Sequence, residues 1–96
     1  MDICQAIKGR NYISVTYNGY QRVLQPAAHG VSSAGNQVLR AYQTEGGSAS
    51  GVMPGWKMMS LNEISNFQIL DKTFTGNPPG FKPGDRGMTT VHCELT

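Results

Sequence analysis

Two cysteines and two histidines are the side chains of this sequence best suited to metal or thiol chemistry: Cys4, His29, His92 and Cys93. They include no Cys-x-x-Cys pair, the spacing that commonly starts a zinc site. His92 and Cys93 are neighbours in a predicted strand, so their side chains should point to opposite faces and cannot share a proton. We therefore expect no metal ion, no cofactor and no catalytic thiolate, and we interpret Cys93 as a buried, inert cysteine.

Hydroxyl and carboxylate chemistry is no better supported. The serines lack the strand-turn-helix context of a nucleophile elbow, and the six acidic residues form no pattern that marks a cleft. Gly46-Gly47 is not followed by the Gly-Lys-Ser/Thr of a phosphate-binding loop. The sequence predicts that the protein is not an enzyme.

Cations beside aromatic rings are the more promising feature. Three cations lie on separate predicted strands, each within two residues of a ring: Arg22 near Tyr20, Arg40 near Tyr42, and Lys57 near Trp56. Guanidinium groups and ring faces together suit phosphates and bases. Neighbouring strands would gather them on one concave face, so the predicted ligand-binding residues are Arg22, Arg40, Tyr42, Trp56 and Lys57. The alternative is that each cation lies singly on a solvated face while the rings fill the core.

The elements that must position these residues begin with a hairpin. Residues 12–17 and 20–25 both have extended patterns, and Asn18-Gly19 between them favours a type I′ turn, which needs positive φ at both positions. A two-residue turn fixes the register of the two strands. The expected pairs are Tyr17 with Tyr20, Val15 with Arg22, and Ile13 with Leu24.

Further elements follow from local patterns. We expect a short helix over residues 2–8, capped by Asp2 and stopped by Gly9, strands over 37–43, 56–60, 65–70 and 89–95, and a helical turn over 61–64. Pro26 should end or bulge the second strand, residues 32–36 should form a turn, and residues 45–55 a mobile surface loop. The glycines and prolines of residues 75–87 indicate a tail that wraps the domain.

Composition narrows the class of protein. A chain of 96 residues allows one domain, and a net charge of +2 is less basic than is usual for a duplex-DNA binder. Two cysteines are too few for the disulfide framework of a small secreted domain. The first residues contain no long apolar run. We predict a cytoplasmic protein without a signal peptide or membrane span.

Several short motifs, taken in order, are similar to those of the WYL domain. They are Ala-Ile at 6–7 followed by Ile-x-Val-x-Tyr at 13–17, Arg-Val-Leu-x-Pro at 22–26, Gly-Asn-x-x-Leu-x-Ala-Tyr at 35–42, and Met-x-Leu-x-x-Ile at 59–64 leading to Phe74. The resemblance implies an Sm-like small β-barrel of about five strands with an N-terminal helix over residues 1–74. Residues 75–96 would be a Pro/Gly-rich extension that packs on the barrel and ends in a strand.

The chain departs from the family at its signature positions. The name-giving Trp-Tyr-Leu corresponds to Gln37-Val38-Leu39, so that the leucine alone is kept. In the later arginine motif, at residues 57–64, Lys57 keeps the first cation, while Ser60 and Glu63 replace two arginines. The fold therefore transfers better than the function.

Members of the family sit in bacterial regulators behind a DNA-binding helix-turn-helix, or beside defence systems, and are regarded as sensors of nucleotides or single-stranded nucleic acid. We therefore expect a non-catalytic module that recognises a nucleotide-derived ligand or short nucleic acid in bacterial or phage regulation or defence. Without a helix-turn-helix, promoter binding is not expected. The alternative is a protein-interaction or assembly subunit that oligomerises through barrel edges, with an apolar patch drawn from Met53, Met58 and Met59 near Trp56. At least one of these methionines is expected to fill the core instead.

Overall fold

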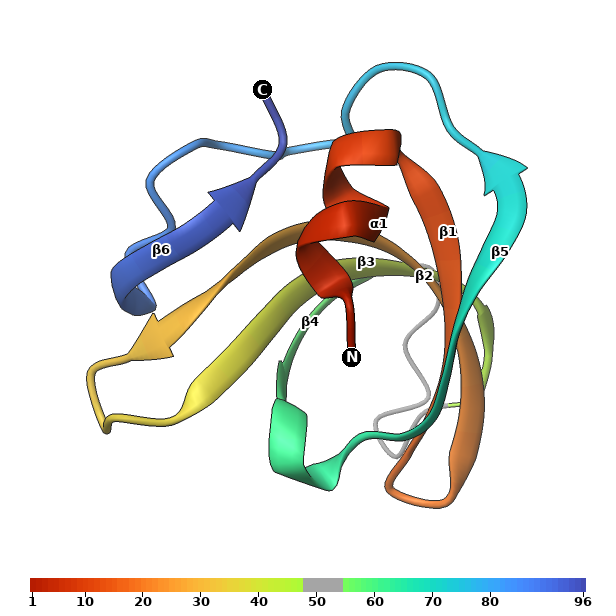
Figure 1. Cartoon of the computed structure of the whole chain (residues 1–96), viewed down its shortest axis with the longest axis horizontal. Coiled ribbons are helices and arrows are strands. Elements are labelled where there is room, and N and C mark those ends of the chain that lie inside the picture. Colours follow the sequence, from red (N-terminus) through yellow and green to blue (C-terminus); the bar gives the residue numbers. More distant parts are fainter. Residues whose placement is uncertain (48–54) are drawn as a thin grey trace.

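The computed structural model describes residues 1–47 and 55–96, which form a short helix and six antiparallel strands (Figure 1). The elements in chain order are α1 (Ile3–Gly9), β1 (Asn11–Tyr17), β2 (Tyr20–Ser32), β3 (Gln37–Gly46), β4 (Gly55–Ser60), the single 3₁₀ turn η1 (Leu61–Glu63), β5 (Ser65–Thr73) and β6 (Met88–Glu94). The expectation of a mainly β fold with an N-terminal helix is confirmed.

The expected Sm-like barrel is not found among the described residues, whose sheet is open. Its strand order is β4-β3-β2-β1-β5, with β6 paired to β2, and the described residues of β4 and β5 do not pair with each other. The long β2 pairs on one edge with β1 over Tyr20–Leu24 and with β6 over Ala28–Ser32. Helix α1 lies between β1 and β6 and contacts both (Figure 1). The sheet thus has two branches that meet at β2.

The change of partner along β2 occurs around Pro26. Proline has no N–H for a regular ladder, and the pairing with β3 shifts register between Pro26 and Ala28, so the expected bulge is present. Beyond it, β6 approaches β2 so closely that a Cβ on Gly30 would collide with the backbone oxygen of Thr90. A glycine is therefore required where the second branch begins.

The first hairpin has the predicted register, with Tyr17 opposite Tyr20, Val15 opposite Arg22, and Ile13 opposite Leu24. Asn18 and Gly19 have φ values of 51° and 77°, as a type I′ turn requires. The turn at residues 32–36 is also present and is closed by a backbone hydrogen bond from Ser32 to Asn36.

The predicted helix ends and the predicted loop need correction. Asp2 makes no side-chain cap, and the helix is terminated by Arg10 in the left-handed region (φ 53°) rather than by Gly9. Glu45 and Gly46 belong to β3, and Gly55 to β4, so the loop predicted over 45–55 is shorter. Its remaining residues from 48 to 54, including Met53, lie outside the described residues.

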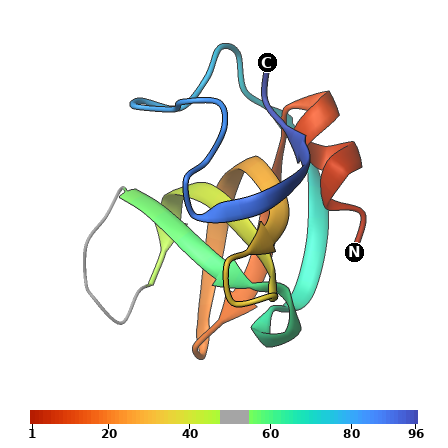
Figure 2. The same ribbon diagram turned by 90° about the vertical axis from the view of Figure 1, so that its left-hand side faces the viewer.

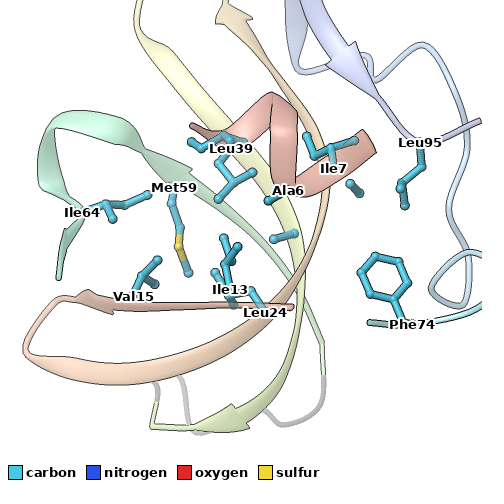
Figure 3. Packing of buried hydrophobic residues seen from close by; sticks show 13 residues of the cluster. Ala6, Ile7, Ile13, Val15, Leu24, Leu39, Met59, Ile64, Phe74 and Leu95 are labelled. Atoms are coloured by element: carbon cyan, nitrogen blue, oxygen red, sulfur yellow. The ribbon is translucent and has the colours of Figure 1, made fainter. Parts of the chain in front are cut away.

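The main core lies between α1 and the inner face of the sheet (Figure 3). Ile3, Ala6 and Ile7 of α1 pack against a set of strand residues that includes Ile13, Val15, Leu24, Leu39 and Met59. A second, smaller cluster of Ala28, Val38 and Met88, with Met58 beside it, lies on the other face of β2 and β3. Met59, which is 1% exposed, fills the core, as expected of at least one of the three methionines.

The chain termini are tied together. A disulfide joins Cys4 of α1 to Cys93 of β6, and the Arg10 guanidinium donates hydrogen bonds to the backbone oxygens of Gly76 and Thr96. Cys93 is therefore paired, and it is half-buried, which corrects its interpretation as a buried, inert cysteine. The described part of the chain has no helix that is long and apolar enough to cross a membrane.

Candidate ligand-binding pocket

Three of the five predicted binding residues lie together. Tyr42 of β3 and Trp56 of β4 are cross-strand partners whose rings meet edge to face, with centroids 5.4 Å apart. Arg40 is two residues from Tyr42 in β3 and so lies on the same face of the sheet. This face is opposite to the one that packs against α1, because Leu39 and Ala41, which alternate with Arg40 and Tyr42 along β3, belong to the main core.

Arg22 is elsewhere, so the predicted shared face of three cations is wrong. Its side chain is 3% exposed and donates hydrogen bonds to Gln43 Oε1 (3.2 Å) and to the Tyr17 backbone oxygen (3.1 Å). The guanidinium carbon also lies 5.2 Å from the Tyr17 ring centroid and 5.6 Å from that of Tyr20. Arg22 is a structural arginine inside the sheet. The register predicted for the hairpin already implied this, since it put Arg22 on the side of Val15 and Leu24.

Lys57 is also separated from the group. It pairs with Ala41, a core residue, and strand alternation puts its side chain on the opposite face of β4 from Trp56. The prediction that Lys57 shares a surface with Arg40 is therefore wrong.

Arg40 and Trp56 line a pocket of about 260 Å³ under the Pro/Gly-rich segment, which we call the outer pocket. Its other lining residues are Ala28, Gly80, Phe81, Lys82, Gly84, Asp85 and Arg86. The segment runs from the end of β5 to β6 and arches over the β4 side of the sheet (Figure 2). Trp56 Nε1 donates a hydrogen bond to the Pro79 backbone oxygen at 2.8 Å, which attaches the segment to β4.

An ion pair fixes the second attachment. Arg40 Nε lies 2.7 Å from Asp85 Oδ2 and its NH2 nitrogen 3.3 Å from Oδ1, while the Gly87 N–H donates to Oδ1 at 2.8 Å. The Arg40 hydrogen bonds, together with the Gly87 N–H and the positive charge of Arg40, hold the pKa of Asp85 below its usual range despite partial burial. Asp85 is therefore an anion in the folded protein at neutral pH.

The pocket combines positive charge with aromatic surface. Arg40, Lys82 and Arg86 carry three positive charges against the one negative charge of Asp85, and the side chains of Lys82 and Arg86 are exposed. Trp56 and Phe81 supply rings. The sequence patterns did not single out Lys82, Asp85 or Arg86, because they lie in a segment whose place on the sheet is set by contacts distant in sequence.

The soft ligands form a second group at the other end of β6. Sγ of Cys4 and Cys93 and a ring nitrogen of His29 all lie within 4.8 Å of one another. Burial, reinforced by repulsion from His92, lowers the pKa of His29, so its neutral form is favoured. The spacing rules missed this group because α1, β2 and β6 each contribute one residue.

Comparisons with family models, with curated proteins and with solved structures found no match to this chain. Membership of the WYL family therefore stays a prediction from its ordered motifs. The cytoplasmic location also stays a prediction, and the Cys4–Cys93 pairing weighs against the reasoning behind it, since disulfides persist mainly in oxidising compartments.

Proposed function

We propose that this protein is a non-catalytic module that binds a small nucleotide-derived anion in the outer pocket. The observation that carries the proposal is the convergence of Arg40, Lys82 and Arg86 with the rings of Trp56 and Phe81 on one concavity. Cations bind phosphate oxygens, and aromatic faces bind the planar base. Asp85 orients Arg40 and offsets part of the charge, which leaves Lys82 and Arg86 as the phosphate-binding pair.

The size of the pocket favours a small ligand over a nucleic acid strand. Its volume of about 260 Å³ is slightly below the roughly 300–1,000 Å³ of typical small-molecule sites. The charge of the whole chain, +2, is also low for a protein that must follow a phosphate backbone. A regulatory or defence role in bacteria or phage is the part of this proposal supported by the WYL-like motifs.

Assembly through strand edges is the second candidate, and the open sheet supports it. Within the described residues, β4 and β5 each pair with a single neighbouring strand, so each leaves one edge unpaired. Such edges can add a strand from another chain.

Calorimetric titration with AMP, ATP, adenosine and inorganic phosphate at low and high salt tests the leading proposal. We expect the nucleotides to bind better than either fragment and binding to weaken as salt screens the cations. The single tryptophan, Trp56, gives an independent fluorescence signal from the pocket itself.

Replacing both Lys82→Gln and Arg86→Gln should weaken nucleotide binding roughly tenfold, since two exposed contacts of up to about 1 kcal/mol each are lost. Lys72→Gln on β5 is the matched control, because Lys72 lies over the Tyr12 ring and does not line the pocket. Absence of binding at low salt, or equal affinity of the double variant and the control, would reject the proposal. Light scattering on the same samples reports whether the chain assembles instead.

A further inference from the structure

Three soft ligands that are distant in sequence meet where α1, β2 and β6 come together. Cys93 is the cross-strand partner of His29, and Cys4 reaches the pair from α1. The distance from Cys4 Sγ to His29 Nδ1 is 3.9 Å, and the two cysteine Cα atoms are 5.7 Å apart. Each ligand comes from a different element, so the backbone already holds all three in place.

His29 is poorly satisfied by its protein surroundings. Its Nε2 is buried without a hydrogen-bond partner, and the polar contact of its Nδ1 is the Cys4 sulfur. A buried histidine nitrogen normally has a strong partner. An imidazole whose Nδ1 lies beside Cys4 Sγ, and whose ring has a buried nitrogen without a partner in the described part of the chain, is placed to act as a metal ligand.

We propose that the reduced protein binds one zinc ion through Cys4 Sγ, Cys93 Sγ and His29 Nδ1, so that a disulfide and a metal ion are alternative links between α1 and β6. In a tetrahedral site, zinc–ligand bonds of about 2.0–2.3 Å place ligand atoms roughly 3.5–3.8 Å apart. The 3.9 Å between Cys4 Sγ and His29 Nδ1 is close to that spacing. The two sulfurs, which are bonded in the disulfide, must separate to the same spacing.

The fourth coordination position belongs to water. A pocket of about 300 Å³ lined by Cys4, Cys93, Lys8, Arg10 and Glu94 leads to the sulfurs, so solvent and the ion can reach them. His92 is not a ligand in this arrangement, because its Nε2 is hydrogen-bonded to Gln37 Oε1 at 3.1 Å.

Exchange of the disulfide for a zinc ion needs a reductant, and the reverse needs an oxidant. A dithiol reductant gives two electrons and two protons to the Cys4–Cys93 bond and itself becomes a disulfide, which leaves two thiols on the protein. Zinc binding then releases both thiol protons. Oxidation by a peroxide takes two electrons from the two thiolates, re-forms the disulfide, releases zinc, and gives water once two protons are added.

Cobalt titration tests the site in the full chain. Protein is reduced, freed of reductant without air, and titrated with Co²⁺; we expect one ion per chain, with the intense visible bands of tetrahedral cobalt, a sulfur-to-cobalt charge-transfer band, and displacement by Zn²⁺. His29→Gln should weaken binding by more than the roughly 10–100-fold that loss of an outer partner costs. His92→Gln is the matched control and should bind as tightly as the wild type.

The proposal is overturned if reduced protein binds no stoichiometric Co²⁺, if oxidised protein binds it equally, or if His92→Gln loses as much affinity as His29→Gln. Thermal unfolding of the reduced protein tests the proposal even if reduction destabilises the fold. Zn²⁺ should raise the melting temperature of the reduced wild type, or refold it, and leave the Cys4→Ser/Cys93→Ser variant unchanged. No response of the wild type to Zn²⁺ also overturns it.

Discussion

Breaking the Cys4–Cys93 bond should destabilise this protein more than any single surface substitution. The bond joins residues separated by 89 positions, so it closes nearly the whole chain into one loop. For a loop of that length, the chain-entropy model gives about 4–5 kcal/mol of stabilisation. A domain of this size unfolds with an entropy of about 0.2 kcal/mol/K, so the melting temperature should fall by about 20 °C on reduction. This is an upper value, because the reduced unfolded chain keeps some structure.

Scanning fluorimetry with and without a phosphine reductant measures the shift, with a chelator present so that no metal replaces the disulfide. The Cys4→Ser/Cys93→Ser variant is the control: it should melt near the reduced wild type and ignore the reductant. A shift of less than about 4 °C in the wild type, which corresponds to under 1 kcal/mol, would refute the loop-closure reasoning. An equal shift in the double variant would show that the reductant acts elsewhere.

Three further substitutions test separate parts of the structure. Asp85→Asn should lower the free energy of unfolding, measured in urea at pH 7, by about 1–2 kcal/mol. The difference from the wild type should vanish as the pH falls below about 4 and through the lowered pKa of Asp85, because protonation then breaks the ion pair with Arg40 in the wild type too. Gly30→Ala should cost about 1–3 kcal/mol by the same measurement, since its Cβ would displace β6. Arg22→Met should cost about 1–3 kcal/mol by leaving Gln43 and a backbone oxygen without a donor, yet nucleotide affinity in the calorimetric titration should not change.

Local signals predicted the local structure well. Asn18-Gly19 fixed both the turn and the register of the first hairpin, because a two-residue connection leaves no freedom for another pairing. The alternation of residues 37–43 likewise separated Leu39 and Ala41, which are buried in the main core, from Arg40 and Tyr42. These results depend on neighbours within a few positions.

Closure of the sheet could not be predicted in the same way. Whether strands close into a barrel depends on which edges pair, and here the described residues of the end strands β4 and β5 do not pair with each other. The pairing of the second half of β2 with β6, about 60 residues later in the chain, is also non-local. The pairing of Cys4 with Cys93 is equally non-local. Spacing rules for cysteines and histidines detect ligands that share one turn or hairpin, so they carry no information about a group assembled from three elements.

The position of the cations shows how a correct register can still give a wrong site. Residue type alone made Arg22 a ligand candidate, whereas its pairing with Val15 put it inside the sheet. A cation on the face of core residues needs backbone oxygens, amides or rings as partners. Gln43 and the tyrosines supply them to the two terminal nitrogens and the plane of the Arg22 guanidinium, while its buried Nε has no hydrogen-bond partner among the described residues. When binding residues are chosen from a strand, the face of the sheet to which each side chain points should therefore be considered before its chemistry.

Strand β6 connects the outer pocket with the group formed by Cys4, His29 and Cys93. It starts two residues after Arg86 of the outer pocket and contains Cys93 near its end. Glu94 adds a direct link, because its carboxylate accepts a hydrogen bond from the Gly84 N–H in the segment that lines the pocket. The position of that segment thus depends on how firmly β6 is held against β2 and α1, and the bond at Cys93 is the covalent part of that attachment. The Cys4–Cys93 bond and the shape of the outer pocket are consequently linked through β6.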